Sequence, residues 1–231
     1  MDIEIVKSLV IKSTSCKVNL IHVKIKDIKE RAEEIIRLIT DTSWVSHLRP
    51  VSRRTYTANA NRTINKIVNN ILRKVDDEVT EDFGEYLVSV SAQDALVNEL
   101  SHGRIPLSEI LKEKSFRNHG FDFHTESPRA IIIFGESKYS KSENPYNIAL
   151  SQICDFIKDK KNDTDFELLE NFVTPPAMIN ALNEQMGYAA SFSMNSNNPT
   201  LIFNRALKSS HIKELSSNPE LYLIGVEVIA N

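Results

Sequence analysis

Two hydrophobic patterns alternate near the start of the chain. Apolar side chains fall at every second position over much of 18–25, which is typical of a strand, and 3–11 is rich in β-branched residues. Over 28–39 the apolar spacing changes to three and four, which predicts a helix. Asp27 is suited to cap the first turn of this helix, and the pattern ends near Thr40.

Two longer helical patterns follow. The segment 42–75 is predicted to be a loop around Pro50 and a helix from about Arg62. A second long helix is predicted over 80–101, opened by a cluster of acidic residues and closed by glycine and proline. Residues 107–111 fit either a strand or one turn of helix, and both interpretations stay open.

Two strands joined by a short turn are predicted in the middle of the chain. They cover 120–125 and 129–139, and Pro128 in the connection favours an antiparallel hairpin. The remaining predicted elements are an amphipathic helix at 145–160, helices from Pro175 and at 205–215, a loop at 187–198 and a strand at 221–229.

The composition indicates a folded protein, because 41% of the 231 residues are hydrophobic and 26% are charged. No apolar run is long enough to span a bilayer and no secretory pattern is visible, so we expect a cytoplasmic protein with no membrane contact. Cys16 and Cys154 lack the spacing of a metal or redox motif and are predicted to be reduced core residues. The absence of a glycine-rich phosphate loop argues against an ATPase unless a partner supplies one.

Charge is distributed unevenly along the chain. The segment 42–75 contains seven basic residues and no acidic residue, whereas the rest of the chain contains 21 basic and 31 acidic residues. A basic segment on an acidic protein could follow a phosphate backbone, or it could be an ordinary solvated surface. Trp44 and Tyr56 in this segment could stack on bases, although packing inside the protein is the favoured interpretation.

The candidate chemistry lies on the predicted hairpin. Asp122 stands between two phenylalanines, and an apolar run ends in Glu136 and Lys138. Residues two apart in a strand point to the same face, so this glutamate and this lysine would project together. Two carboxylates can hold Mg²⁺ or Mn²⁺, and an ammonium can orient a water or contact a phosphate. The pattern therefore predicts a metal-dependent phosphodiesterase.

The predicted order of elements resembles the PD-(D/E)xK nuclease superfamily, whose core is a helix, three strands, a helix and a fourth strand. The resemblance covers about 78–160, with 221–229 as the fourth strand. It implies an α/β (α+β) fold with a restriction-endonuclease-like αβββαβ core. We expect this nuclease-like domain at 76–231, with an N-terminal β-rich and helical extension at 1–75 packed on it.

The same resemblance assigns further residues to the site. The backbone carbonyl of Ser137 would complete the metal shell, and Glu85 on the preceding helix would add an acid. Glu81 lies one turn earlier and fits too, but Glu85 is preferred because an apolar helix follows it. Gln152 would place a polar group in the site, or it is an ordinary polar position of its helix. His124 is interpreted as a hydrogen-bonded strand residue rather than a metal ligand.

A narrower resemblance is carried by four short motifs, at 82–87, 120–122, 134–138 and 223–228. They are similar to the HamA family, the small proteins of Hachiman anti-phage defence systems. This resemblance implies a Mg²⁺-dependent endodeoxyribonuclease that acts on DNA and works with, and is restrained by, a HamB-like helicase subunit. The alternatives are a catalytically inactive nuclease fold that serves as a DNA-binding adaptor or helicase regulator, and a restriction-type endonuclease subunit.

Overall fold

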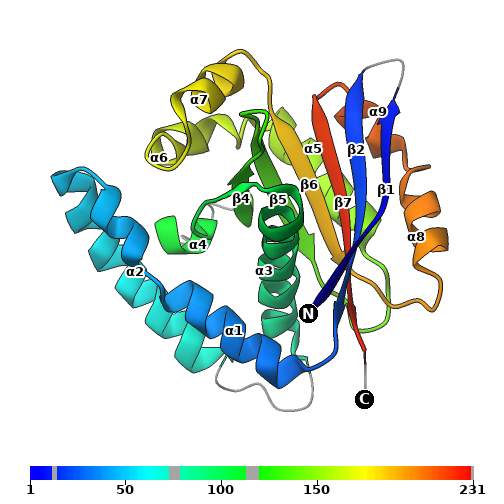
Figure 1. Ribbon diagram of the computed structural model, residues 1–231, viewed down its shortest axis with the longest axis horizontal. Coiled ribbons are helices and arrows are strands. Elements are labelled where there is room, and N and C mark those ends of the chain that lie inside the picture. The colour runs from blue at the N-terminus through cyan, green and yellow to red at the C-terminus, as the bar shows by residue number, and fades with distance from the viewer. Residues whose placement is uncertain (12–14, 73–78, 113–119, 230–231) are drawn as a thin grey trace.

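The centre of the fold is one seven-stranded sheet, which contains strands from both ends of the chain (Figure 1). The computed structural model describes residues 1–11, 15–72, 79–112 and 120–229. The strand order is β1-β2-β7-β6-β5-β4-β3; the inner pairs β2–β7, β7–β6 and β6–β5 are parallel, and the outer pairs are antiparallel. The strands are β1 (Asp2–Ile11), β2 (Cys16–Ile25), β3 (Gly103–Arg104), β4 (Phe123–Glu126), β5 (Ile132–Lys138), β6 (Gly187–Ser193) and β7 (Glu220–Val228).

Helices cover both faces of this sheet. They are α1 (Ile28–Thr40), α2 (Pro50–Asn70), α3 (Glu81–Leu100), α4 (Ser108–Leu111), α5 (Tyr146–Lys158), α6 (Phe166–Leu169), α7 (Pro175–Leu182), α8 (Pro199–Ala206) and α9 (Ser210–Leu215), with 3-10 turns η1 (Ser43–His47) and η3 (Asp163–Asp165). As predicted, the side chain of Asp27 caps α1 by accepting a hydrogen bond from the N–H of Glu30. Thr80 caps α3 in the same way. Within the described ranges, no helix is both long and apolar enough to cross a membrane.

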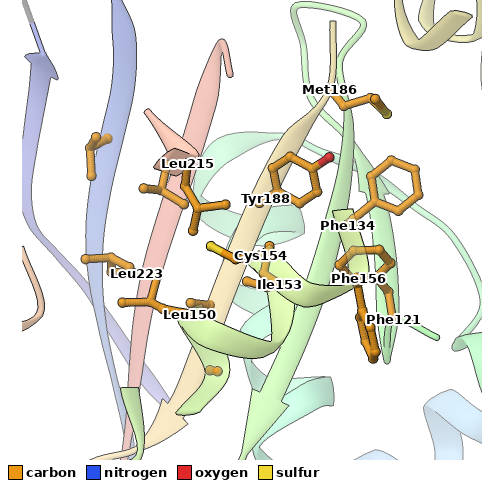
Figure 2. Close-up of a cluster of buried hydrophobic side chains, with 14 of the residues drawn as sticks. Phe121, Phe134, Leu150, Ile153, Cys154, Phe156, Met186, Tyr188, Leu215 and Leu223 are labelled. Atoms are coloured by element: carbon orange, nitrogen blue, oxygen red, sulfur yellow. The ribbon is translucent and has the colours of Figure 1, made fainter. Parts of the chain in front are cut away.

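Two hydrophobic clusters lie on the two faces of the sheet, because successive strand side chains point to opposite sides. In β5, Ile133 faces the cluster built with α1, α2 and α3, and Phe134 faces the cluster built with α5, α8 and α9. Figure 2 shows the rings of Phe121, Phe134 and Phe156 gathered beside the ring of Tyr188 in this second cluster. Cys16 and Cys154 are buried core residues, as predicted.

The prediction of a loop at 187–198 was wrong for its first half, which forms β6. Every residue of this strand is buried between the two helical layers, the large Tyr188 and Phe192 as well as the small glycine, alanines and serines. The hydroxyl of Ser191 donates to the carbonyl of Glu136, and the hydroxyl of Ser193 donates to the carbonyl of Ser140. These bonds satisfy polar groups that would be costly to bury unpaired, which is why a serine-rich stretch can form an inner strand.

Two other boundaries differ from the predictions. The helix expected from about Arg62 begins at Pro50, where proline occupies the first helical turn, a position that needs no backbone N–H. The single helix expected over 205–215 is two short helices, α8 and α9. Of the two interpretations left open for residues 107–111, the structure has the helical turn, α4. The strand at 221–229 is present as β7, but β6 rather than β7 lies next to β5.

The N-terminal strands are part of the same sheet, since β2 pairs with β7 in parallel. The predicted boundary between 75 and 76 falls outside the described residues, and the two-domain division stays a prediction.

The buried ring of His102 links β4 to β7 and predicts acid sensitivity. Its Nδ1 lies 2.9 Å from the Thr125 hydroxyl, and its Nε2 lies 3.2 Å from the Tyr222 hydroxyl, which donates to Glu220. Burial, assisted by the charge of Lys17, lowers the pKa of His102 to about 4. The unfolded chain takes up this proton near pH 6.5, so stability is lost as the pH falls from 6.5 towards 4.

We expect the buried His102 to lower the free energy of unfolding by about 2 kcal/mol when the pH falls from about 7 to about 5. Urea denaturation of wild type and His102→Gln at the two pH values measures this contribution. The variant should start less stable at neutral pH and lose about 2 kcal/mol less on acidification. An equal pH dependence in both proteins would contradict the assignment.

Candidate active site

The end of β5 carries a buried ion pair. Glu136 and Lys138 lie two residues apart on one face of the strand, and the Nζ of Lys138 lies 2.7 Å from Oε1 of Glu136. The glutamate is 1% exposed, and its other oxygen, Oε2, is buried with no hydrogen-bond partner among the described residues. A buried carboxylate oxygen without a partner is unfavourable unless the site serves a ligand.

Asp122 lies one residue before β4 and is joined to β5 by its backbone and its side chain. Its N–H donates to the carbonyl of Gly135 at 2.9 Å, and its Oδ2 accepts the N–H of Ser137 at 2.8 Å. The N–H and C=O of one strand residue point to the same side, so the carbonyl of Ser137 is directed towards Asp122. The structure therefore places Asp122, Glu136, Ser137 and Lys138 at one end of the hairpin, as the sequence predicted.

Two glycines allow this end of the hairpin to be assembled. A Cβ on Gly135 would lie 2.3 Å from the ring of Phe123, so only glycine lets β4 approach β5 here. A Cβ on Gly84 would lie 2.3 Å from the ring of Tyr139, the residue after β5. The first turns of α3 therefore pack directly against the end of β5, which brings the neighbouring Glu85 towards the site.

A small cavity of about 50 Å³ separates α3 from the hairpin and from α4. Glu85 and Asp122 both line it, whereas Glu81 does not. The sequence did not single out Glu109, which also lines the cavity and accepts a hydrogen bond from the hydroxyl of Tyr86. The signal was hidden because Glu109 lies in the segment whose secondary structure the pattern left open.

Gln152 lies on α5, which packs against β5 and β6. Its side chain is half-buried, and no hydrogen bond joins it to Asp122, Glu136 or Lys138 in the described part of the chain. Its place in the site therefore stays a prediction.

The electrostatics of the site follow from its burial. Burial raises the pKa of Glu136 well above its usual value, the charges of Asp122 and Glu85 raise it further, and Lys138 opposes them. Burial alone would lower the pKa of Lys138, but Glu136, Asp122 and Glu85 outweigh it and raise that pKa. An excess of negative charge around a single ammonium is an arrangement that a divalent cation would relieve.

A series of polar contacts links the backbone of Asp122 to Ser108, His124 and Asp165. The N–H of Ser108 donates to the carbonyl of Asp122, and its hydroxyl lies 3.1 Å from Nδ1 of His124. Nε2 of His124 lies 3.3 Å from Asp165, which pairs with Lys112 at 2.5 Å. His124 is thus a hydrogen-bonded strand histidine, as predicted, and burial lowers its pKa although Asp165 opposes this.

The residues at the hairpin end fit a divalent metal with few protein ligands. Glu136 offers its unpartnered Oε2, Asp122 offers a carboxylate, and Ser137 offers a carbonyl directed to the same side. Hard oxygen ligands of this kind suit Mg²⁺, which keeps several waters. Within the described residues, the ligand atoms of Asp122, Glu136 and Glu85 do not all lie within 4.8 Å of one another, so the three carboxylates do not form one closed ligand set.

A group of three metal-ligating side chains comes together away from the hairpin, within the described residues. Cys154 on α5 and the pair His211 and Glu214 on α9 have ligand atoms within 4.8 Å of one another. Sequence spacing could not indicate this group, because α5 and α9 are far apart in the chain. Glu214 also lies 3.6 Å from Lys158.

The fold and the hairpin residues together define a mixed α/β protein with two carboxylates and a lysine at one end of the β4–β5 hairpin. No curated protein and no solved structure matches the chain. The HamA family model matches residues 2–228. The chain therefore belongs to the HamA family, which confirms the resemblance drawn from the four sequence motifs.

Proposed function

We propose that this HamA-family chain is a metal-dependent nuclease that cleaves DNA in a bacterial anti-phage defence system and is restrained by a partner helicase. The observation that carries the proposal is the buried Glu136, whose Oε2 has no described partner, beside Asp122 and Lys138. Membership of the HamA family supports the defence role, because this family is the small component of Hachiman systems.

The order of elements supports a PD-(D/E)xK core. Along the chain, α3 is followed by β3, β4 and β5, then by α5, and then by β6, which pairs with β5. With the short helices α4, α6 and α7 left aside, this order agrees with the αβββαβ core of that superfamily, with β6 in the place expected for 221–229. The candidate residues lie on the second and third strands of this unit or directly before them, where the superfamily carries its acidic residues and lysine.

The proposed chemistry is hydrolysis of a phosphodiester. Asp122, Glu136 and the carbonyl of Ser137 would hold Mg²⁺ or Mn²⁺. The bound metal would lower the pKa of a water and stabilise the charge that develops on the phosphate. Asp122 is held by the N–H of Ser137, so its second oxygen has a fixed direction.

Lys138 supplies the positive charge of the site. Its raised pKa keeps it an ammonium at neutral pH, and its hydrogen bond to Glu136 sets the direction of its side chain. Its remaining N–H groups can orient the attacking water or donate to a phosphate oxygen. Glu85 would accept a hydrogen bond from a metal-bound water across the small cavity, and Gln152 would contact the substrate from α5.

A plasmid cleavage assay tests the proposal, with the chain purified together with the helicase encoded beside it. Cleavage should require Mg²⁺ or Mn²⁺ and stop when EDTA is added. Glu85→Gln should slow cleavage by about 10- to 100-fold because it removes support for a metal-bound water. Glu81→Gln is the matched control, one turn away and exposed, and should cleave at the wild-type rate.

Absence of cleavage with helicase, ATP and Mg²⁺ would contradict the nuclease proposal. If DNA binding persisted in that case, the adaptor alternative would take its place. Isothermal calorimetry with Mn²⁺ separates the two, since heat of binding that disappears in Asp122→Asn is expected only for the nuclease.

A further inference from the structure

The exposed side of α2 concentrates positive charge on an otherwise acidic protein. The segment 42–75 contains no acidic residue, and α2 forms most of its described part. Figure 1 shows α2 at the margin of the molecule opposite α8. Five exposed residues form what we term the α2 basic face: Arg54, Asn61, Arg62, Asn65 and Lys66.

Helix geometry places these five side chains on one side. At about 100° per residue they fall within an arc of about 140°, and Arg54 and Lys66 are separated by about 18 Å along the axis. Arg54 and Lys66 form no ion pair in the described part of the chain, and Arg62 donates to the side chain of Asn59 at 3.3 Å. The buried side of α2, which includes Ala60 and Ile64, packs into the cluster with α1 and α3.

The aromatic residues of the segment are used for packing, as predicted. The rings of Trp44, Tyr56 and Phe172 meet edge to face, with centroids 5.5–6.2 Å apart. These three rings join η1 and α2 to the turn after α6, so Trp44 and Tyr56 are not available as a platform for bases. A surface with cations and amides but without exposed rings is suited to a sugar–phosphate backbone rather than to base recognition.

Helix α2, which carries the α2 basic face, is connected to the candidate active site through α4. Helix α2 packs against α4, and Ser108, the first residue of α4, donates its N–H to the carbonyl of Asp122. The cavity that Glu85 and Asp122 line is also bordered by Ser108 and Glu109 of α4. A chain of phosphates lying on α2 would therefore approach the hairpin across α4.

We propose that the α2 basic face binds the phosphate backbone of nucleic acid and leads it to the hairpin end of the sheet. The delivery step rests on the proposed nuclease function, whereas the binding step stands by itself. The three basic side chains of this face offer only N–H donors and positive charge, which match phosphate oxygens that only accept. In B-DNA, the distance from Arg54 to Lys66 corresponds to about five phosphates of one strand.

A protein partner fits this surface less well. Stable protein interfaces contain a central group of buried apolar or aromatic anchors. The apolar residues on the exposed arc of α2 are only Val51, which is 81% exposed in the first turn, and Ala58, and this arc has no exposed aromatic side chain. The acids that approach α2, Glu167 and Glu170, lie across a groove from its first turns, on the side of Tyr56.

Fluorescence anisotropy in EDTA tests the proposal, with a labelled single-stranded oligonucleotide and a labelled duplex of the same length. The full chain is compared with the triple variant Arg54→Gln, Arg62→Gln and Lys66→Gln across a series of KCl concentrations. We expect the variant to bind at least about tenfold more weakly at low salt, with a log–log salt slope smaller by about 3. EDTA prevents metal-dependent cleavage, so binding is measured separately from activity.

The matched control is Lys160→Gln, Lys208→Gln and Lys213→Gln, which removes the same charge near α5, α8 and α9. It should keep the wild-type slope, and circular dichroism should show both variants folded. An unchanged slope in the α2 variant would overturn the proposal even if the plasmid assay showed a nuclease. Unchanged DNA binding with loss of helicase co-purification would also overturn it, and would assign the face to an acidic protein surface. Altered binding without any cleavage would retain the proposal and reject the nuclease.

Discussion

Replacing Glu136 with glutamine should lower DNA cleavage by about 1,000-fold while leaving the protein at least as stable as wild type. The loss is expected because the amide cannot supply the negative charge that a divalent cation needs. The stability is expected because the buried carboxylate has a raised pKa, so its charged form is disfavoured in the folded protein. A neutral isostere removes that cost, and Lys138, whose side chain is 21% exposed, can turn to water.

The two readouts separate a catalytic role from a structural role. Plasmid cleavage gives the rate, and thermal unfolding at about pH 6 and about pH 8 gives the stability. The advantage of the variant in stability should be larger at the higher pH, where more of the wild-type carboxylate must ionise inside the protein. Glu143→Gln, on the exposed loop after β5, is the control and should change neither readout. A variant that unfolds earlier than wild type would make Glu136 a structural residue.

The second large effect is expected at Phe121, beside Asp122. Its side chain is 1% exposed and meets the rings of Phe134, Phe156 and Tyr188 with centroids 5.1–6.0 Å apart (Figure 2). Phe121→Ala should cost about 3–5 kcal/mol, because it removes a whole ring and leaves a cavity between layers that cannot close. For a chain of this length, that corresponds to a decrease in Tm of roughly 6–20 °C.

Urea denaturation of Phe121→Ala, Phe121→Leu and Ile148→Ala measures this contribution. The leucine variant should recover more than half of the loss, because it fills most of the volume. Ile148 is 56% exposed on α5, and its alanine variant should stay within about 0.5 kcal/mol of wild type. A loss below about 1 kcal/mol in Phe121→Ala would mean that the aromatic cluster repacks.

The hairpin and its charged residues were predictable because their signals are local. An apolar run ending in Glu136 and Lys138 indicates both the strand and the face. The cap of α1 was predictable for the same reason, since Asp27 acts on a residue three positions away. Local patterns thus predicted which residues lie together at the hairpin end, and both the site and its chemistry stay a proposal.

The parts that sequence reasoning missed depend on distant partners. Strand β6 carries Tyr188 and Phe192, but glycine, alanines and serines fill its other positions, and the serine hydroxyls are satisfied by β5 and by Ser140, so its strand pattern is weak without these partners. The first half of α2 packs through Tyr56 on Trp44 and Phe172, and Glu109 joins the candidate site through the short helix α4. Such features are set by tertiary contacts, which override local propensity.

The parallel pairing of β2 with β7 has a consequence for how this chain is synthesised. Lys17 is in register with Glu220, so β2 leaves the ribosome about 200 residues before β7, its parallel neighbour, is synthesised. At ordinary rates of translation this interval lasts about 10–40 s. Until it ends, one edge of β2 lacks its backbone partner and presents apolar side chains, which are targets for chaperones and for unwanted strand pairing. The sheet that holds the hairpin is completed only when β7 emerges and joins β2 to β6.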